Sequence, residues 1–439
     1  MISTFFFVTG TLLISLNLFR ILGISISDWF YLAALICAII ETITIERDKF
    51  KCWFQNKYLW YAFLILLGAV ISLANAKFLQ NAIIEIAQLI FVITVFISLI
   101  WIMVLRNKIR VVIKAFVFSG FFTSLVALYD FITGSRLGPT ISNTPYVQLW
   151  GRYAGTLGHP NKLGFLLVIT TILTFYLVFS SYKWKKLLWI SCLLIQLLGI
   201  YLSGSLTAYL GLLLGVFLLF LYKIQKNKFP LRIISSIIFL CAAFLVAILA
   251  LSNMNHQKPV NLQSITLMIT IDRVISQTSE SRIVIFKDAF QSILKSPLVG
   301  VGFDQISTSG INRTNREIAG TVHNAEIQMF YVGGIFSFMG FLLIYANLTV
   351  HSITVIHRMN WSDQPILLIC LAVATLSIIL MDQFQDSLYQ REKWLIIGLF
   401  VANIWLKKYL GERKQQKINI LSGSSTDQAI KLTPGKNIN

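Results

Sequence analysis

Long apolar runs recur along almost the whole chain, and no other feature limits its possible folds as much. Hydrophobic residues make up 56% of the sequence and charged residues only 13%, with a mean hydropathy of +0.74. These values are atypical of soluble domains, and about 20 apolar residues in a helix cross the hydrocarbon core of a bilayer. The sequence therefore predicts an all-α, polytopic transmembrane helix bundle. We place about twelve spans at residues 4–20, 24–42, 59–76, 82–105, 111–131, 162–182, 187–203, 205–222, 233–252, 326–350, 365–381 and 394–406.

The basic residues are concentrated in particular connections. The chain carries a formal net charge of +19, and its Lys and Arg crowd residues 43–58, 105–110, 183–186 and 222–232 and the end of the chain after residue 406. With both termini in the cytoplasm, all these segments lie on the cytoplasmic side, as the positive-inside rule requires. The charge thus indicates a multi-pass protein of the inner or plasma membrane, and it does not indicate nucleic acid as a partner.

This topology divides the chain into two parts. Residues 1–410 form the transmembrane domain, and the polar residues 411–439 form a disordered cytoplasmic tail. Residues 253–325 form one long external loop. Within it Ser279 is a candidate N-cap and the apolar residues from Ile283 to Leu294 have helical spacing, which predicts an amphipathic helix at the membrane interface. The first span lacks a basic start and a cleavage site, so we expect it to be retained.

The sequence lacks the motifs that are typical of metal-dependent and nucleotide-dependent enzymes. The five cysteines have no metal-ligand spacing, so neither a disulfide framework nor a zinc site is expected. The external segments contain no Asp-x-Asp pair, and the chain has no glycine-rich nucleotide loop and no His-Glu-x-x-His motif. We therefore predict no metal site and no cofactor.

The first candidate site is the glycine-rich segment 151–164, at the outer mouth of a span. Its glycines allow backbone N–H groups to approach a ligand, and Arg152 offers a planar fork suited to phosphate oxygens. His159, Asn161 and Lys162 follow closely, so the segment predicts an anion site. The alternative is a structured turn whose cations touch lipid headgroups.

The second and third candidates lie in the long external loop. Arg282 falls near the start of the predicted interfacial helix, where it either faces the bundle or pairs with Glu280 or Asp288 in solvent. His323 stands just before an apolar span, where an imidazole can exchange protons near neutral pH. Alternatively, Asn324 caps the helix and His323 is merely interfacial.

Together these segments resemble the O-antigen ligase and polysaccharide polymerase superfamily of membrane glycosyltransferases. The resemblance covers roughly residues 150 to 400 and rests on four elements in the expected order. They are Arg152 with Gly155 to Gly164; Ser203 to Gly211 at the opening of a span; Arg282 with Pro297, Gly300 and Gly302; and His323-Asn324 followed by Gly333, Gly334 and Gly340.

The resemblance implies transfer of a glycan, at the outer face and without a metal, from a polyprenyl diphosphate to the hydroxyl of an acceptor glycan. It implies catalytic roles for three residues: Arg152 and Arg282 hold the diphosphate and stabilise it as a leaving group, and His323 contacts either the acceptor hydroxyl or the donor, with general base as one candidate role. The implied substrate-binding residues are His159, Asn161, Lys162, Arg313, Arg316 and Asn324. The bilayer, a flippase and a chain-length regulator are the implied partners.

Two positions depart from the family pattern. The family often has Arg where this chain has Leu206, so one cation could come instead from Lys162, Arg313 or Arg316. The family often has Asn where this chain has His159, which makes His159 a second candidate for proton transfer.

The resemblance leaves open whether the chain polymerises repeats for a capsule, exopolysaccharide or O-antigen, or ligates a finished glycan onto a lipid or protein. An anion or sugar transporter is the rival from another class, although no inverted repeat is evident.

Overall fold

The structure is a computed structural model that describes residues 2–16, 20–21, 24–45, 57–135, 137–138, 152–224, 284–305, 322–358, 366–385 and 387–405. Nearly all of this is helix, which confirms the all-α prediction. The exception is one antiparallel pair of two-residue strands, β1 (Arg20–Ile21) and β2 (Ile24–Ser25), between the first two helices.

Ten labelled α-helices carry most of the described chain. They are α1 (Ile2–Leu12), α2 (Ile26–Ile45), α4 (Lys57–Ile71), α5 (Leu79–Leu105), α6 (Ile109–Thr133), α8 (Pro160–Ser180), α9 (Trp184–Ser203), α10 (Leu206–Ile224), α14 (Ala325–Arg358) and α15 (Ile366–Asp382). Two further helices cover residues 284–295 and 391–405. Short 3-10 turns occur at η1 (Ile14–Leu16), η3 (Ser72–Asn75), η4 (Gly155–Leu157) and η5 (Phe303–Gln305).

Six helical stretches among the described residues are long and apolar enough to cross a membrane, and α1, α10 and α15 are shorter apolar helices. This confirms a multi-pass helical membrane protein. The number of about twelve spans stays a prediction, because the expected span at 233–252 lies outside the described residues.

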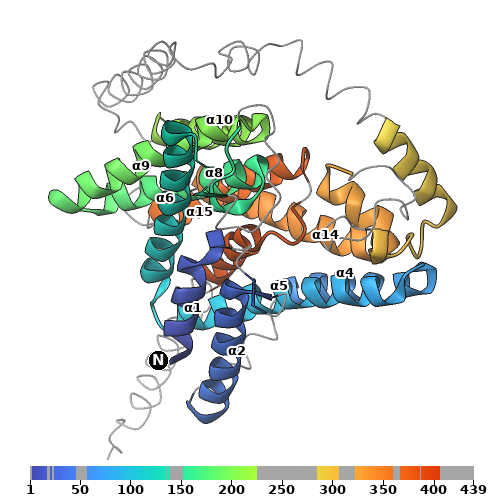
Figure 1. The fold of residues 1–439 in the computed structure, drawn as a ribbon. Coiled ribbons are helices and arrows are strands. Elements are labelled where there is room, and N and C mark those ends of the chain that lie inside the picture. Colours follow the sequence, from blue (N-terminus) through green and yellow to red (C-terminus); the bar gives the residue numbers. More distant parts are fainter. Residues whose placement is uncertain are drawn as a thin grey trace, which may run out of the picture.

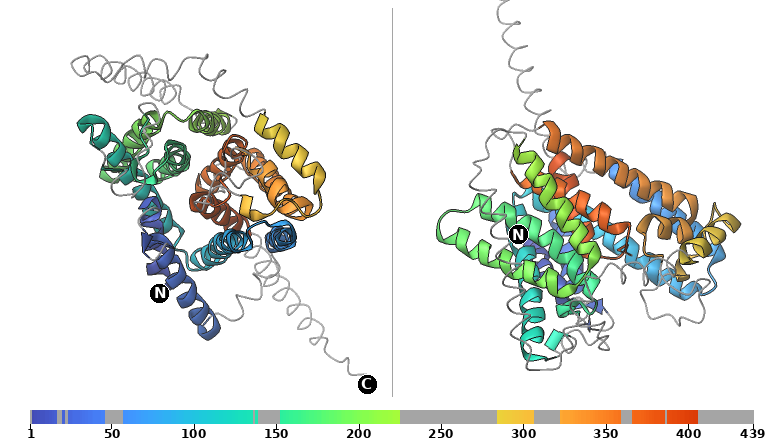
Figure 2. Two further views of the ribbon diagram at one scale, coloured as in Figure 1. Left: turned by 45° about the vertical axis from the view of Figure 1, so that its right-hand side comes forward. Right: turned by 90° about the horizontal axis from the view of Figure 1, so that it is seen from above.

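Helix α8 occupies the middle of one half of the molecule, in contact with α6, α9, α10 and α15 (Figure 1). Within its apolar stretch 83% of the residues are buried, against 33% for the stretch that contains α4. Helix α14 runs alongside α4 in the other half. In the left view of Figure 2 several helices are seen close to end-on, as in a bundle.

Close packing of α4 against α14 depends on small residues. A Cβ atom on Gly68 would lie 2.4 Å from the backbone nitrogen of Ser337, and one on Gly340 would lie 2.6 Å from the carbonyl oxygen of Tyr61. The Ser337 hydroxyl donates to the carbonyl of Ile65 at 2.8 Å. Small residues and such hydrogen bonds are the usual means by which helices associate in membranes.

Helix α14 is interrupted at Gly334, whose φ of 64° and ψ of −165° are not helical. The interruption frees carbonyl groups, and the segment that follows helix 284–295 pairs with them. The N–H of Val301 donates to the carbonyl of Tyr331 at 2.9 Å, and the N–H of Gly302 donates to that of Val332 at 3.1 Å. The Gly300 and Gly302 element of the resemblance is thus joined directly to the Gly333-Gly334 element.

The predicted helix at residues 279–294 is present from residue 284, with Ala289 and Ile293 buried and Phe290 and Leu294 exposed. Its amphipathic character stays a prediction, because apolar side chains are exposed as well as buried. Its place at a membrane interface stays a prediction. The tail 411–439, most of the long loop, and Arg282, Arg313 and Arg316 lie outside the described residues.

We predict that Gly334→Ala lowers the free energy of unfolding of the purified protein by about 3 kcal/mol, because the added Cβ atom strains the backbone and overlaps neighbouring atoms. A Cβ at this position would lie 2.3 Å from the carbonyl oxygen of Leu298. The matched control is Gly134→Ala, where φ is 65° but no atom lies within 4 Å of the added carbon. This variant should lose only about 1 kcal/mol. Equal losses in the two variants would show that packing at the α14 interruption is unimportant.

Candidate functional site

Four helices begin in one polar region of the bundle: α8, α10, α14 and the helix over residues 391–405. Their starts are joined by side-chain contacts described below. The beginning of a helix carries unpaired N–H groups and the positive end of the helix dipole. Several such ends together favour a negatively charged ligand.

Arg152 joins the starts of two of these helices. Its Nε donates to the carbonyl of Ser203 at 2.8 Å, just before α10, and its Nη2 donates to the side-chain oxygen of Asn161 in the first turn of α8. The hydrocarbon part of Arg152 also passes directly over Gly204, where a Cβ would lie 3.2 Å from its Cγ. The guanidinium is therefore fixed beside the Ser203 to Gly211 element.

The segment that follows Arg152 is held in place by hydrogen bonds to α6 and to η1. The backbone N–H of Thr156 donates to the Thr123 hydroxyl at 3.0 Å, and the Thr156 hydroxyl donates to the carbonyl of Ser15 at 2.7 Å. Gly155 has a φ of 52° and lies so close to Thr123 that a Cβ would be 2.5 Å from the hydroxyl oxygen. Here glycine serves the packing of a turn, as the alternative interpretation of segment 151–164 proposed.

His159 is the N-cap of α8, and its Nδ1 accepts the backbone N–H of Asn161 at 3.1 Å. Burial, together with the positive charges of Lys162 and Arg152 and the neighbouring His323, lowers the pKa of His159 from 6.5 to about 4. The ring is thus neutral at pH 7, with its hydrogen on Nε2. In that form it is a hydrogen-bond donor and a weak base.

His323 is half-buried and lies close enough to interact electrostatically with His159. The structure therefore brings His323 together with the segment around Arg152, although the two are far apart in the sequence. Asn324, beside it, is the helix cap that the alternative interpretation expected. Its side-chain oxygen accepts the N–H of Ile327 at 2.9 Å, at the start of α14.

Lys162 is exposed and lies near both His159 and Glu392. Glu392 is buried, at the start of the helix over residues 391–405. Its neighbour Arg391 forms a bidentate ion pair with Asp28 at the start of α2. These contacts bring the last helix to the same polar region.

The connection from Asp382 to Lys393 is the part of this region that sequence reasoning missed. Gln383 contacts both Asn324 and Glu326. Asp382 and Lys393 form a fully buried ion pair at 2.6 Å, and Tyr345 and Ser387 also donate to Asp382. The available signal was the density of polar residues in a short connection between two apolar runs, since buried charges near a membrane are costly and are often functional.

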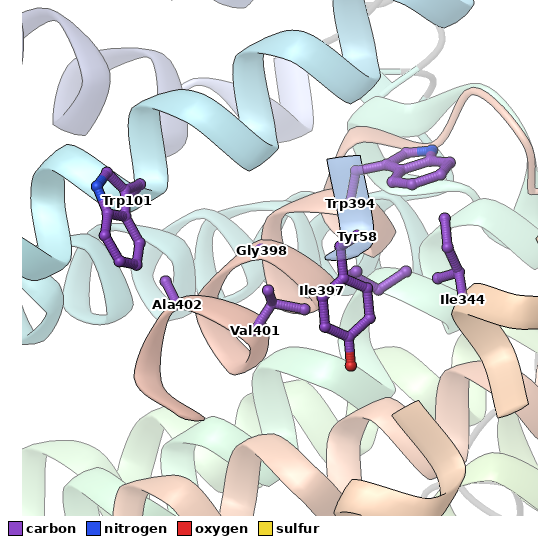
Figure 3. A pocket seen from close by; sticks show the side chains of 8 residues that line it. All are labelled: Tyr58, Trp101, Ile344, Trp394, Ile397, Gly398, Val401 and Ala402. Carbon is purple, nitrogen blue, oxygen red and sulfur yellow. The ribbon is translucent and has the colours of Figure 1, made fainter. Parts of the chain in front are cut away.

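An apolar pocket elsewhere in the bundle is separate from this polar region. It is lined by Tyr58, Trp101, Ile344, Trp394, Ile397, Gly398, Val401 and Ala402 (Figure 3). None of the candidate site residues lines it. The Trp394 ring nitrogen donates to the carbonyl of Leu388 at 2.8 Å, which ties this wall to the 382–393 connection.

The arrangement suits an anion better than a metal. Arg152, Lys162 and the starts of four helices supply positive potential, and two imidazoles stand beside them. Within the described ranges no group of three His, Cys, Asp or Glu side chains is placed to hold a metal ion, and the three described cysteines are free.

His159 also makes stability depend on pH. Its pKa in the folded protein, about 4, is below its ordinary value of 6.5. The unfolded chain therefore binds more protons between these values, and stability falls as pH decreases from 6.5 to 4. We predict that His159→Asn, which keeps a good helix cap, loses less melting temperature than the wild type over this range. Parallel acid profiles for the two proteins would contradict the prediction.

Comparison with known proteins finds a family match, which lies in the middle of the chain. Residues 191–342 match the family model described as O-Antigen ligase. No curated protein gives a significant match to the chain. The matched range contains three of the four elements of the resemblance and leaves out the segment around Arg152, which the structure places against it. The match confirms the resemblance for this part of the chain: residues 191–342 of this multi-pass membrane protein are similar to the O-antigen ligase family, whose members are glycosyltransferase-like enzymes.

Proposed function

We propose that this protein joins lipid-linked oligosaccharide repeats into a surface polysaccharide, using a polyprenyl diphosphate as the leaving group. The observation that carries the proposal is the meeting of Arg152, His159 and His323 at the starts of α8, α10 and α14. These residues come from different parts of the chain, and the family match covers the elements that pack against them.

In the proposed reaction, an oxygen of the acceptor glycan attacks the anomeric carbon of the donor. The bond between that carbon and the diphosphate oxygen breaks, and the diphosphate leaves with the electron pair. The hydroxyl proton passes to His323. Arg152, and Arg282 from the long loop, stabilise the charge that develops on the leaving group. No step of the proposed reaction uses a metal ion.

In this proposal Arg152 acts beside the segment in which the family often has a further cation, at the position of Leu206. Leu206 is exposed, whereas the Arg152 guanidinium lies on the carbonyl of Ser203, three residues earlier. Lys162 supplies a second charge at the outer edge of the cluster. Asn161 positions Arg152 through its side-chain oxygen.

Two alternatives are a ligase and a transporter. A ligase would use the same donor and move the glycan to a lipid or protein, so product analysis separates it from a polymerase. A transporter would use a broken helix to line a path. The interruption of α14 does not favour this, because the freed carbonyls of Tyr331 and Val332 are paired with Val301 and Gly302.

The direct test is purified protein in liposomes with a polyprenyl-diphosphate oligosaccharide. We expect longer glycans from the wild type and a loss of rate of about 100-fold in Arg152→Ala and in Arg282→Ala. The control is Lys108→Ala, which removes a cation just before α6, away from the polar region, and should transfer normally. A chelator should not reduce the rate. Solute flux without glycan transfer would overturn the proposal in favour of a transporter.

The role of His323 has its own test. We expect His323→Ala to lower kcat by about 100-fold and to leave the KM for the donor nearly unchanged, because a general base acts on the acceptor proton. Steady-state rates at varied donor concentration measure both quantities. A variant that raises the donor KM while kcat stays constant would make His323 a binding residue.

A further inference from the structure

Gln383 contacts Asn324, the residue that follows His323 in the chain. The residue follows directly after α15, and its side-chain amide makes contacts in two directions. Its Oε1 accepts from Asn324 Nδ2 at 3.1 Å, and its Nε2 donates to Glu326 Oε1 at 2.6 Å. Gln383 thus lies between the two residues that open α14.

The direction of each hydrogen bond follows from the backbone. The N–H of Ile327 can only donate, so the Asn324 atom that receives it is the oxygen. The Asn324 nitrogen must then donate to Gln383, and Gln383 must present its oxygen there. Its nitrogen is left to donate to the Glu326 carboxylate. A side-chain amide is the group that satisfies both contacts, because a carboxylate lacks the donor.

The backbone at Gln383 is also fixed in position. Asp382, the residue before it, pairs with Lys393 at 2.6 Å and accepts from Tyr345 and Ser387. The ammonium of Lys393 further lies 4.8 Å from the ring centroid of Phe341. Asp382 and Lys393 are both fully buried. The end of α15 therefore cannot shift without breaking a buried ion pair, which is costly.

From this geometry we propose that Gln383 is a positioning residue for His323. It sets Asn324 and the first turn of α14, and thereby the backbone that carries the imidazole. The inference rests on the proposed function, in which His323 takes the proton of the acceptor hydroxyl. Errors of about 1 Å in the placement of such a group reduce rates up to about 100-fold.

The experiment exchanges the amide of Gln383 and the carboxylate of Glu326. Gln383→Glu removes the donor and places two carboxylates in contact, so kcat should fall about 10-fold or more with the donor KM unchanged. Glu326→Gln alone keeps an oxygen that can accept from Gln383, so its kcat should stay within about twofold. Gln383→Glu combined with Glu326→Gln restores one donor and two acceptors. The double variant should recover most of the lost kcat.

A second arm asks whether Gln383 acts through His323. In a His323→Ala background, Gln383→Glu should cause no further loss of kcat, because the group that it positions is gone. The control is Asn347→Asp near the other end of α14, which makes the same amide-to-carboxylate change beside Lys57. It should leave kcat unchanged. If Gln383→Glu does not fold, Gln383→Met serves in its place, because it removes the hydrogen bonds to Asn324 and Glu326, and a third to the carbonyl of Ile379, without adding a charge.

The outcomes separate the two proposals. An active wild type in which the exchanged pair is not rescued, or in which the loss persists fully in the His323→Ala background, would overturn the role of Gln383 alone. A loss of melting temperature with unchanged kcat per folded molecule would do the same, since it would make Gln383 purely structural. A wild type that transfers no glycan would overturn the proposed function, and this inference with it.

Discussion

Every backbone group that a helix leaves unpaired must find a partner within the protein, because hydrocarbon offers none. Among the described residues, that constraint accounts for the interruption of a long helix. Helix α14 breaks at Gly334, and the segment from Pro297 to Gly302 supplies the missing hydrogen bonds. The loop that carries Arg282 is therefore connected to the break in α14, and the two elements depend on one another.

The same constraint explains why the polar residues gather where helices begin. A helix start leaves N–H groups that need acceptors, and here side chains provide them: His159 for α8 and Asn324 for α14. Both caps are also candidate site residues. Capping and the proposed function thus coincide at these positions. The alternative interpretations of 151–164 and of Asn324 as structural elements are correct descriptions of the local geometry, and they do not oppose a role in binding.

The apolar runs made most of the fold predictable. Spans expected at 111–131 and 162–182 are found as α6 (Ile109–Thr133) and α8 (Pro160–Ser180). Length and hydropathy determine such helices locally, so one sequence is sufficient to find them. The pairing of Arg152 with Ser203 and Asn161, and the meeting of His159 with His323, needed tertiary packing. The family resemblance pointed to these segments, and residue spacing alone did not.

The connection 382–393 was missed for a physical reason. In the sequence its charges resemble those of an exposed turn, because neither their burial nor a remote partner is visible there: Arg391 pairs with Asp28, which is 363 positions away. Only the packed bundle shows that Asp382 and Lys393 are buried together. A short polar connection between two apolar runs is thus ambiguous until its partners are known.

The charges of the polar region also impose an order on the proposed reaction. Burial lowers the pKa of His159, and the positive charges of Lys162 and Arg152 add to this opposition to the charging of an imidazole. If His323 takes a proton, it adds a positive charge to the same cluster. A bound diphosphate brings negative charge and removes that opposition. On this argument the donor must be in place before the acceptor hydroxyl can be deprotonated, so the leaving group itself prepares the base that acts against it.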